Sequence, residues 1–377
     1  MNRPWLVGCC ARVLLLSAML MAPLPRGQAA DMFGLNPGKV ELQSAGPLAF
    51  GPSGILFVGD TKAATVWAID TGDKTGDANQ VRLNVEGLTG QVAALLKASS
   101  DNVQINDLLV NPASGQVYLS VMVKGEKAQA AVIRIDAKGT LSSLALDNIP
   151  QAKVTLPNPP EDKVVGEGPR AQNRRLESIT DLAFYEGRLI VSGSSADKAS
   201  STVRSINFPF QQADTGANVE IFHAAHGRVE DNATIRAFVP FMIDGEPNLL
   251  AGFTCTPLVK FPLNGLNAGK KVRGTTVAEL GNRNRPLDMI VYKKGGRDYL
   301  LMANSARGVM KISTEEIERK EGLTEPVKDG NTAGQKFETI KELVGVVQLD
   351  KLNSTHAVLL VQSAPGAALD LKTVELP

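Results

Sequence analysis

One short pattern recurs along most of this chain and constrains its fold more than any other feature. The pattern is an entry strand, a tight turn, an apolar strand that ends in small polar residues, and a third strand. It is clearest from Asp181 to Ser194, where Glu186-Gly187 forms the hairpin turn. Pro47 to Asp60 aligns with this copy without a gap. Short strands of this kind, bounded by Gly, Pro, Asn and Asp, predict a sandwich, a barrel or a propeller.

The number of copies decides between these three architectures. Besides the two copies above, the unit recurs from Asp107 to Met122, Val239 to Thr254, Asp288 to Ser305 and Asp350 to Ser363, which makes six copies. A fourth strand follows five of them, whereas the sixth copy reaches the end of the chain first. A spare strand from Lys39 to Ala45 precedes the first copy. In a ring it fills the vacancy by pairing around Leu369 to Val374, and no sheet edge stays open.

We therefore predict a single all-β domain over residues 31–377, folded as a six-bladed β-propeller that is closed by an N-terminal strand in the last blade. A seven-bladed ring is the alternative, and it needs a hidden repeat between Val81 and Gln104. A polar, Pro-rich run at residues 148–175 interrupts the repeat as a long insertion. Loops of this length either carry function or are disordered.

Residues 1–30 have the organisation of a secretory signal peptide. Basic residues are followed by an apolar run from Val13 to Leu24, and small residues at Gly27 and Ala29 provide a cleavage site. The apolar run is shorter than the roughly 20 residues of a membrane span. We therefore expect the mature protein to be periplasmic or secreted. Cleavage leaves Cys255 as its only cysteine, which excludes an intramolecular disulfide.

The charge balance limits the partners that the chain can have. Its 40 basic and 39 acidic residues give a net charge of +1, and no basic tract stands out. Neither nucleic acid nor an anionic membrane is an expected partner. We expect a monomer whose partner is a small molecule or a periplasmic or extracellular protein.

Aspartate recurs at the start of the entry strand in four of the six copies, as Asp107, Asp181, Asp288 and Asp350. Carboxylates at equivalent positions around one axis would lie near the mouth of the channel. They could hold a hard divalent cation such as calcium. Alternatively, each one accepts hydrogen bonds from backbone amides where its strand begins.

In a propeller, the links between blades and the turns between second and third strands open on the same face. The alignment therefore gathers on that face Asp60, Lys124, Arg174, Arg175, Glu177, Ser194, Ser195, His223, His226, Arg228, Cys255, Arg283, Arg285, Asn304 and Arg307. Arg283, Arg285 and Arg307, with Asn304 and Asp288 close in sequence, could hold a carboxylate or phosphate through forked hydrogen bonds. The same arginines could instead neutralise the aspartates.

His223 and His226 are two of the three histidines in the chain. On a helical turn this spacing puts both imidazoles on one side, where they could bind an anion or, with Cys255 or a carboxylate, a transition metal. On a strand they would point to opposite faces. Alternatively, the two histidines only pack or form hydrogen bonds within a loop. Cys255 itself is either a reactive thiol beside one of these histidines or a small buried residue.

The blade pattern, as in Pro47 to Asp60, resembles the NHL-repeat and gluconolactonase-like six-bladed propellers over nearly the whole mature chain. In gluconolactonase-like enzymes a divalent cation at the channel mouth is held by a Glu, an Asn and an Asp. The resemblance implies Glu177, Asn304 and Asp288 as the counterparts here. Residues 222–311 also look like secreted bacterial proteins. Two functions stay open: an exported propeller that binds a small anion or a partner protein on its top face, and a metal-dependent hydrolase of lactones or related esters.

Overall fold

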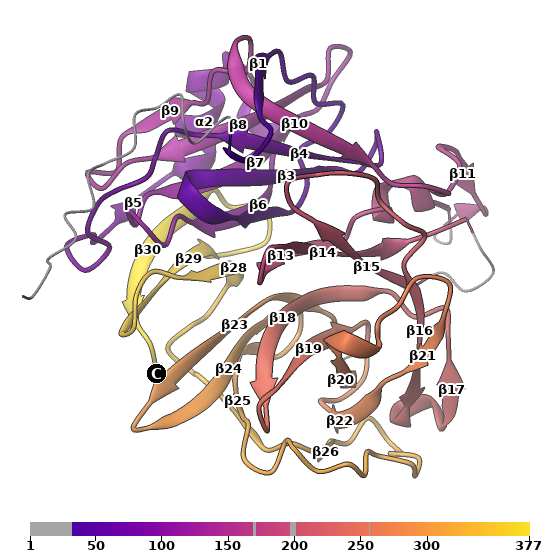
Figure 1. The fold of residues 1–377 in the computed structure, drawn as a ribbon. Coiled ribbons are helices and arrows are strands. Elements are labelled where there is room, and N and C mark those ends of the chain that lie inside the picture. Colours follow the sequence, from indigo (N-terminus) through magenta and orange to yellow (C-terminus); the bar gives the residue numbers. More distant parts are fainter. Residues whose placement is uncertain (1–31, 169–170, 197–200, 256) are drawn as a thin grey trace, which may run out of the picture.

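The computed structural model describes residues 32–168, 171–196, 201–255 and 257–377. The signal peptide predicted at residues 1–30 lies outside these ranges. Within them the regular secondary structure consists mostly of antiparallel sheets, which are arranged around a centre (Figure 1). None of the described helices is long and apolar enough to cross a membrane.

Six sheets form the blades, which are numbered here by the order of their inner strands along the chain. The first three consist of β2 (Leu48–Phe50), β3 (Ile55–Asp60), β4 (Thr65–Asp70) and β10 (Ile149–Thr155) in blade one; β6 (Val103–Val110), β7 (Val117–Val123), β8 (Gln129–Ile135) and β9 (Leu141–Ser143) in blade two; and β13 (Asp181–Tyr185), β14 (Arg188–Ser194), β15 (Ser201–Asn207) and β16 (Ala217–His223) in blade three.

The remaining blades consist of β18 (Ile235–Ile243), β19 (Glu246–Phe253), β20 (Pro257–Pro262), β22 (Thr275–Glu279) and β26 (Ala333–Gly334) in blade four; β23 (Pro286–Lys294), β24 (Arg297–Asn304), β25 (Gly308–Ser313) and β27 (Phe337–Thr339) in blade five; and β28 (Val346–Lys351), β29 (His356–Gln362), β30 (Leu369–Glu375) and β5 (Asn84–Val85) in blade six.

The smaller elements extend these sheets or connect them. They are β1 (Asn36–Gly38) beside β10, β17 (Arg228–Glu230) and β21 (Lys271–Arg273) beside β16, the hairpin of β11 (Val164–Val165) and β12 (Gln172–Asn173), the helix α2 (Leu88–Leu96), and short 3-10 turns at Pro52–Gly54, Ser100–Asn102, Arg174–Glu177, Ala224–His226 and Leu263–Gly265. The architecture is therefore the predicted all-β, six-bladed propeller. Residues 81–104 hold β5, α2 and a 3-10 turn rather than a seventh blade.

The blades do not follow one another around the ring in chain order. Contacts between inner strands place blade one between blades two and three, and blade two between blades six and one. The chain leaves blade one after β4, forms the outer strand of blade six, builds blade two, and then returns as β10 to complete blade one. The stretch predicted as an insertion at residues 148–175 thus contains the outer strand of blade one.

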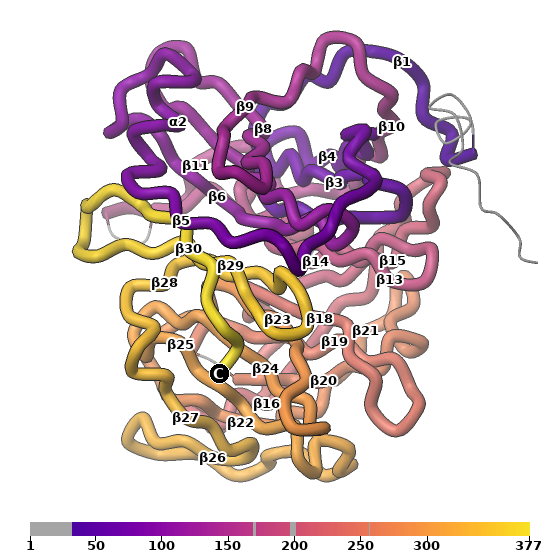
Figure 2. The backbone as a smooth tube through the Cα atoms, turned by 90° about the vertical axis from the view of Figure 1, so that its left-hand side faces the viewer, coloured from indigo at the N-terminus to yellow at the C-terminus, as the bar shows by residue number. Residues whose placement is uncertain are grey.

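The strand that closes the ring is not the predicted one. β5 pairs with β30 through Val85 opposite Leu371, and the yellow and purple strands lie side by side in both views (Figures 1 and 2). Lys39 to Ala45 instead runs between blades one and two. There the Val40 amide donates to the carbonyl of Leu146 at 2.8 Å, and the carboxylate of Asp60 accepts from Gln43 and Ser44. Burial of Val40 and capture of these amides by Asp60 hold the segment away from blade six.

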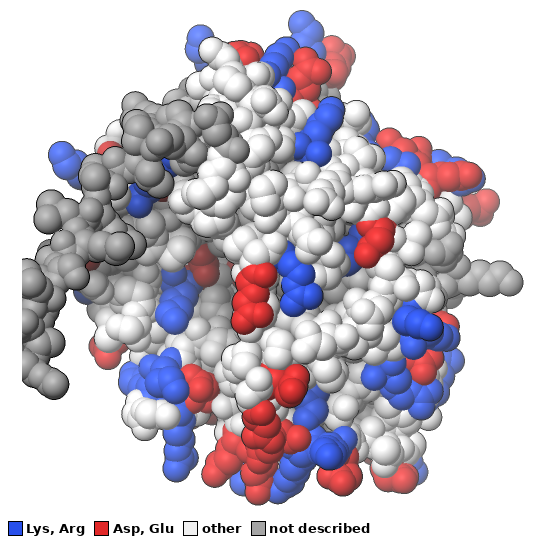
Figure 3. All heavy atoms as spheres, in the orientation of Figure 1, with Lys and Arg blue, Asp and Glu red and all other residues white. Residues whose placement is uncertain are grey.

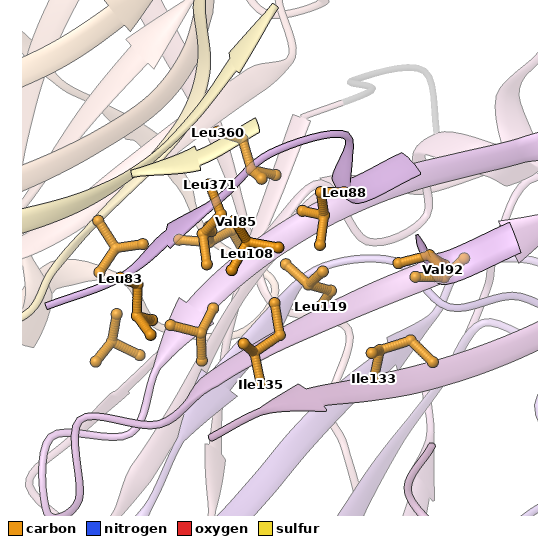
Figure 4. Packing of buried hydrophobic residues seen from close by; sticks show 14 of the residues in the cluster. Leu83, Val85, Leu88, Val92, Leu108, Leu119, Ile133, Ile135, Leu360 and Leu371 are labelled. Atoms are coloured by element: carbon orange, nitrogen blue, oxygen red, sulfur yellow. The ribbon is translucent and has the colours of Figure 1, made fainter. Parts of the chain in front are cut away.

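The core is divided into six apolar clusters, one between each pair of neighbouring blades. Figure 4 shows the cluster in which Leu360 and Leu371 of blade six meet Leu119 and Ile133 of blade two, together with Leu88 of α2. Because each sheet is covered on both faces, all six residues of β3 and of β4 are buried. The clusters hold the inner strands rigidly around the channel.

Candidate functional site

The inner strands surround a channel with two hollows in series. The upper hollow, of about 510 Å³, is lined by residues near the start of the inner strands, such as Thr180, Pro286 and Gln348, and by residues that follow second strands, such as Lys62 and Lys124. The lower hollow, of about 750 Å³, is lined by the residues that follow on the same strands, such as Asp181 and Leu349. Both volumes lie in the range of small-molecule sites in proteins.

The four repeated aspartates lie in the wall of the lower hollow. In each of them one carboxylate oxygen accepts from the backbone N–H of the next residue, at 2.6 to 2.8 Å. The other oxygen accepts from an inner strand of the neighbouring blade: Asp107 from Leu48 at 2.7 Å, Asp181 from Phe238 at 2.6 Å, Asp288 from Leu349 at 2.9 Å and Asp350 from Val110 at 2.7 Å. The predicted bonding to backbone amides is confirmed, and it also joins adjacent blades.

Burial disfavours the charged form of these carboxyl groups. It raises the pKa of Asp107, Asp181 and Asp288 well above the ordinary value, and repulsion from other aspartates of the ring raises it further. Burial also raises the pKa of Asp350, to about 6. The Gln348 amide, turned to donate, reaches Asp288 at 2.8 Å and Asp107 at 3.2 Å, so it caps the ring on its upper side.

The wall of the upper hollow is rich in cations. Lys62, Lys124, Arg236 and Arg285 line it, and Glu177 is the one acidic residue among the lining residues. Arg236 pairs with Glu177, with 2.8 Å between its Nη1 and the carboxylate Oε1. Lys62, Lys124 and Arg285 are exposed, and none of them has an ion pair with a carboxylate in the described ranges. The mouth of the channel therefore carries net positive charge.

The remaining residues of the predicted anion site lie in different places. Arg283 is exposed and lines neither hollow, and the Arg307 guanidinium packs directly against Gly281. Asn304 is buried, and its Oδ1 accepts from the amides of Ala306 and Arg307 at 3.0 and 3.1 Å. Of the three arginines, Arg285 alone lines the channel in the described structure.

The set implied for a divalent cation is spread over three environments. Glu177 lines the upper hollow, Asp288 lines the lower one, and Asn304 lines neither. The oxygens of Asp288 and Asn304 accept backbone N–H groups, whereas Glu177 is held by Arg236. A calcium site made by these three residues stays a prediction.

The two predicted histidines lie together on the outer edge of blade three. β16 ends at His223, the turn Ala224–His226 follows, and the ring centroids of His223 and His226 are 3.9 Å apart. Both rings meet Glu230 of β17: each Nδ1 is 2.8 Å from a different oxygen of its carboxylate, and Arg228 donates to it at 3.0 Å. Cys255, in the turn after β19, completes a cluster with the two imidazoles.

Burial and hydrogen bonds shift the pKa values of the titratable groups at this edge. Burial opposes ionisation of Glu230, but hydrogen bonds from His223, His226 and Arg228 outweigh it and lower its pKa to about 2. Burial lowers the pKa of His223, which stays neutral near pH 7. Burial also raises the pKa of Glu279 to about 7; this carboxyl group accepts from the Ala225 amide at 3.1 Å and so supports the turn between the histidines.

Strand order and the channel together define a six-bladed β-propeller with a cationic mouth. No family model matches the chain, and no curated protein sequence does. Among solved structures, the arabinanase Arb43A of Bacillus subtilis is similar at 15% identity and a TM-score of 0.37, covering 72% of this chain and 96% of that one. The WD40 propeller domain of Doa1 is similar at 8% identity and a TM-score of 0.31, covering 90% and 95%.

Proposed function

We propose that this protein is an exported, monomeric binding propeller that takes a small anionic ligand in the upper hollow of its channel. The observation that carries the proposal is the set of three exposed cations, Lys62, Lys124 and Arg285, around a hollow whose one carboxylate is already paired. Arginine presents a fork of N–H donors that matches a carboxylate or a phosphate. Amide side chains of Gln104 and Gln348 add neutral polar contacts in the same wall.

The overall charge of the chain is close to neutral. Basic and acidic side chains are interspersed over the face in Figure 3, in keeping with the net charge of +1. The cations around the hollow, rather than the overall charge of the chain, would therefore attract an anion. The volume of about 510 Å³ suits a small metabolite.

The test is a calorimetric titration of the purified mature protein with inorganic phosphate, citrate and a panel of sugar phosphates, which measures the affinity for each anion. Replacement of Arg285 by Ala removes a charged hydrogen bond of roughly 1.5 to 3 kcal/mol, and we expect affinity to fall about tenfold or more. Arg283→Ala is the matched control, because Arg283 is exposed two residues earlier but lies outside the hollow. Melting temperatures of both variants should equal that of the unmodified protein.

Two results would overturn the proposal. One is that no anion of the panel binds the unmodified protein. The other is that Arg283→Ala and Arg285→Ala lose affinity equally, since this would indicate a diffuse charge effect rather than contacts in the hollow. A partner protein that binds the same face is the outcome to pursue in the first case, by pull-down with the Arg285→Ala variant as the control.

A metal-dependent hydrolase of lactones or related esters is the second candidate. It is favoured by the presence of carboxylates in both parts of the channel, with Glu177 above and Asp288 below. This candidate predicts bound calcium in the purified protein and lactone hydrolysis that a chelator abolishes. Metal-free protein that shows no hydrolysis with added calcium would contradict it.

A further inference from the structure

The cluster at the outer edge of blade three carries an inference that is independent of the channel. One ring nitrogen of His223, one of His226 and the thiol sulfur of Cys255 all lie within 4.8 Å of one another. None of these residues lines either hollow of the channel. We propose that His223, His226 and Cys255 form a binding site for a transition metal ion of the zinc type.

The spacing of the donor atoms suits such an ion. Bonds of about 2.0 to 2.1 Å to nitrogen and about 2.3 Å to sulfur, at tetrahedral angles, put two nitrogens and one sulfur roughly 3.3 to 3.6 Å apart. The observed limit of 4.8 Å therefore requires side-chain movements of about 1 Å or less. Nitrogen and thiolate donors favour zinc or another transition metal, whereas calcium prefers oxygen.

Glu230 prepares both histidines for metal binding. Its two oxygens each face the Nδ1 of one imidazole at 2.8 Å, which places the ring proton on Nδ1 in both residues. In an imidazole whose single ring proton is on Nδ1, Nε2 carries a free lone pair. A carboxylate behind the ligating histidine is the usual arrangement at zinc sites, where it orients the ring and strengthens the nitrogen as a ligand.

His223 also has a polar atom that the described structure leaves unsatisfied. Its side chain is 2% exposed, and its Nε2 is buried without a hydrogen-bond partner in the described ranges. A buried polar atom without a partner costs stability. A metal ion bound at Nε2 satisfies it.

The backbone at Cys255 adopts a conformation that is unfavourable for a residue with a side chain. Cys255 has a φ of 63°, in the left-handed region that Gly and Asn tolerate better than other residues. Its amide donates to the carbonyl of Asn284 at 2.7 Å, which fixes the turn in this conformation. The thiol thus stands at a strained position, with its sulfur within 4.8 Å of a ring nitrogen of each histidine.

The experiment uses the full mature chain without a histidine tag, stripped with chelator and titrated with Co²⁺ as the probe. We expect one equivalent to bind and to produce a sulfur-to-metal charge-transfer band in the near ultraviolet, and Zn²⁺ to displace it. Cys255→Ser should abolish the band and weaken binding at least 100-fold. Glu230→Gln should weaken binding roughly 10- to 100-fold while keeping the band, because Glu230 acts through the histidines.

Matched variants separate this site from adventitious binding. His226→Ala is informative because its side chain is 44% exposed and its loss disturbs packing little, whereas His356→Ala, at the third histidine, should bind Co²⁺ normally. Circular dichroism of each metal-free variant checks that it is folded. Absence of the charge-transfer band in the unmodified protein, or equal Co²⁺ affinity in the unmodified, Cys255→Ser and His226→Ala proteins, would overturn the proposal. The anion titration of the channel is unaffected by either result.

Discussion

Replacing Asp350 by Asn tests whether ionisation of the buried channel aspartates destabilises the folded protein. The carboxylate of Asp350 accepts from the amides of Val110 and Lys351, and burial raises its pKa from 3.8 to about 6. Between these two pH values the folded protein binds more protons than the unfolded chain. Stability contributed by this group is therefore complete below about pH 4 and is lost as the pH rises through about 6.

The pKa difference sets the size of the effect. Each pKa unit corresponds to 1.36 kcal/mol, so the shift of Asp350 corresponds to at most about 3 kcal/mol. Asp350 also faces the channel, where water reduces the penalty, and we expect about 1 to 3 kcal/mol. Asn cannot ionise, and its amide nitrogen leaves one backbone N–H without an acceptor, which destabilises the variant by about 1 to 3 kcal/mol at every pH.

The informative quantity is therefore the change with pH, not the offset. We expect the free energy of unfolding of Asp350→Asn, relative to the unmodified protein, to improve by about 1 to 3 kcal/mol between pH 4 and pH 7.5. Loss of this charge also relieves the repulsion that raises the pKa of Asp107 and Asp288, an effect of the same sign. Urea unfolding at four pH values measures it. Asp101→Asn, at an exposed position, is the control. A difference that is flat with pH, or that worsens as pH rises, refutes the reasoning.

Two further predictions concern the closure of the ring and the start of the mature chain. Leu83, just before β5, is 4% exposed in the cluster between blades six and two, and its amide donates to Thr373. Leu83→Ala should lower the free energy of unfolding by about 2 to 5 kcal/mol, measured by urea unfolding with the exposed Val344→Ala as the control. An unchanged unfolding midpoint would show that β5 does not close the ring. N-terminal sequencing of exported protein should begin at Ala30 or Asp31, whereas a mature chain that still contains Cys9 would contradict the signal peptide.

The repeated unit could be predicted because its contacts are local. Each entry strand and its partner are joined by a short turn, so alternation and turn residues such as Glu186-Gly187 record the pairing directly. The aspartates could be predicted because the same carboxylate serves the same purpose in four blades. Their second bond, to the neighbouring blade, has no signal in the sequence, since Leu48 or Phe238 donates only a backbone amide.

The closing strand and the order of the blades could not be predicted for a related reason. β5 is two residues long, which is too short to show any alternation. Lys39 to Ala45 alternates better, yet its partners are Leu146 and Asp60, and pairing between segments far apart is decided by packing rather than by pattern. The order of the blades around the ring also leaves no local signal, because the sequence within blade one does not depend on which blades lie beside it.

The sequence indicates only part of the candidate sites. The spacing of His223 and His226 allowed a shared face only on a turn, and the structure forms that turn. Glu230 was missed, although a carboxylate four residues after His226 is within reach of both rings. Lys62 was also missed, but its position two residues after the second strand of its blade is a signal that the repeat alignment contains.

The cations of the channel attract an anion, whereas ionised aspartates of the channel repel it. Four ionised carboxylates beneath the upper hollow would cancel the attraction of Lys62, Lys124 and Arg285. The structure reduces this conflict because burial raises the pKa of each aspartate, so each spends more time protonated than an exposed aspartate does. The Gln348 amide, between the ring and the mouth, satisfies two of the carboxyl groups from above. The same burial that makes the aspartates costly to ionise therefore weakens the repulsion between the ring and a ligand at the mouth, while Asp350, with a pKa of about 6, still ionises near pH 7.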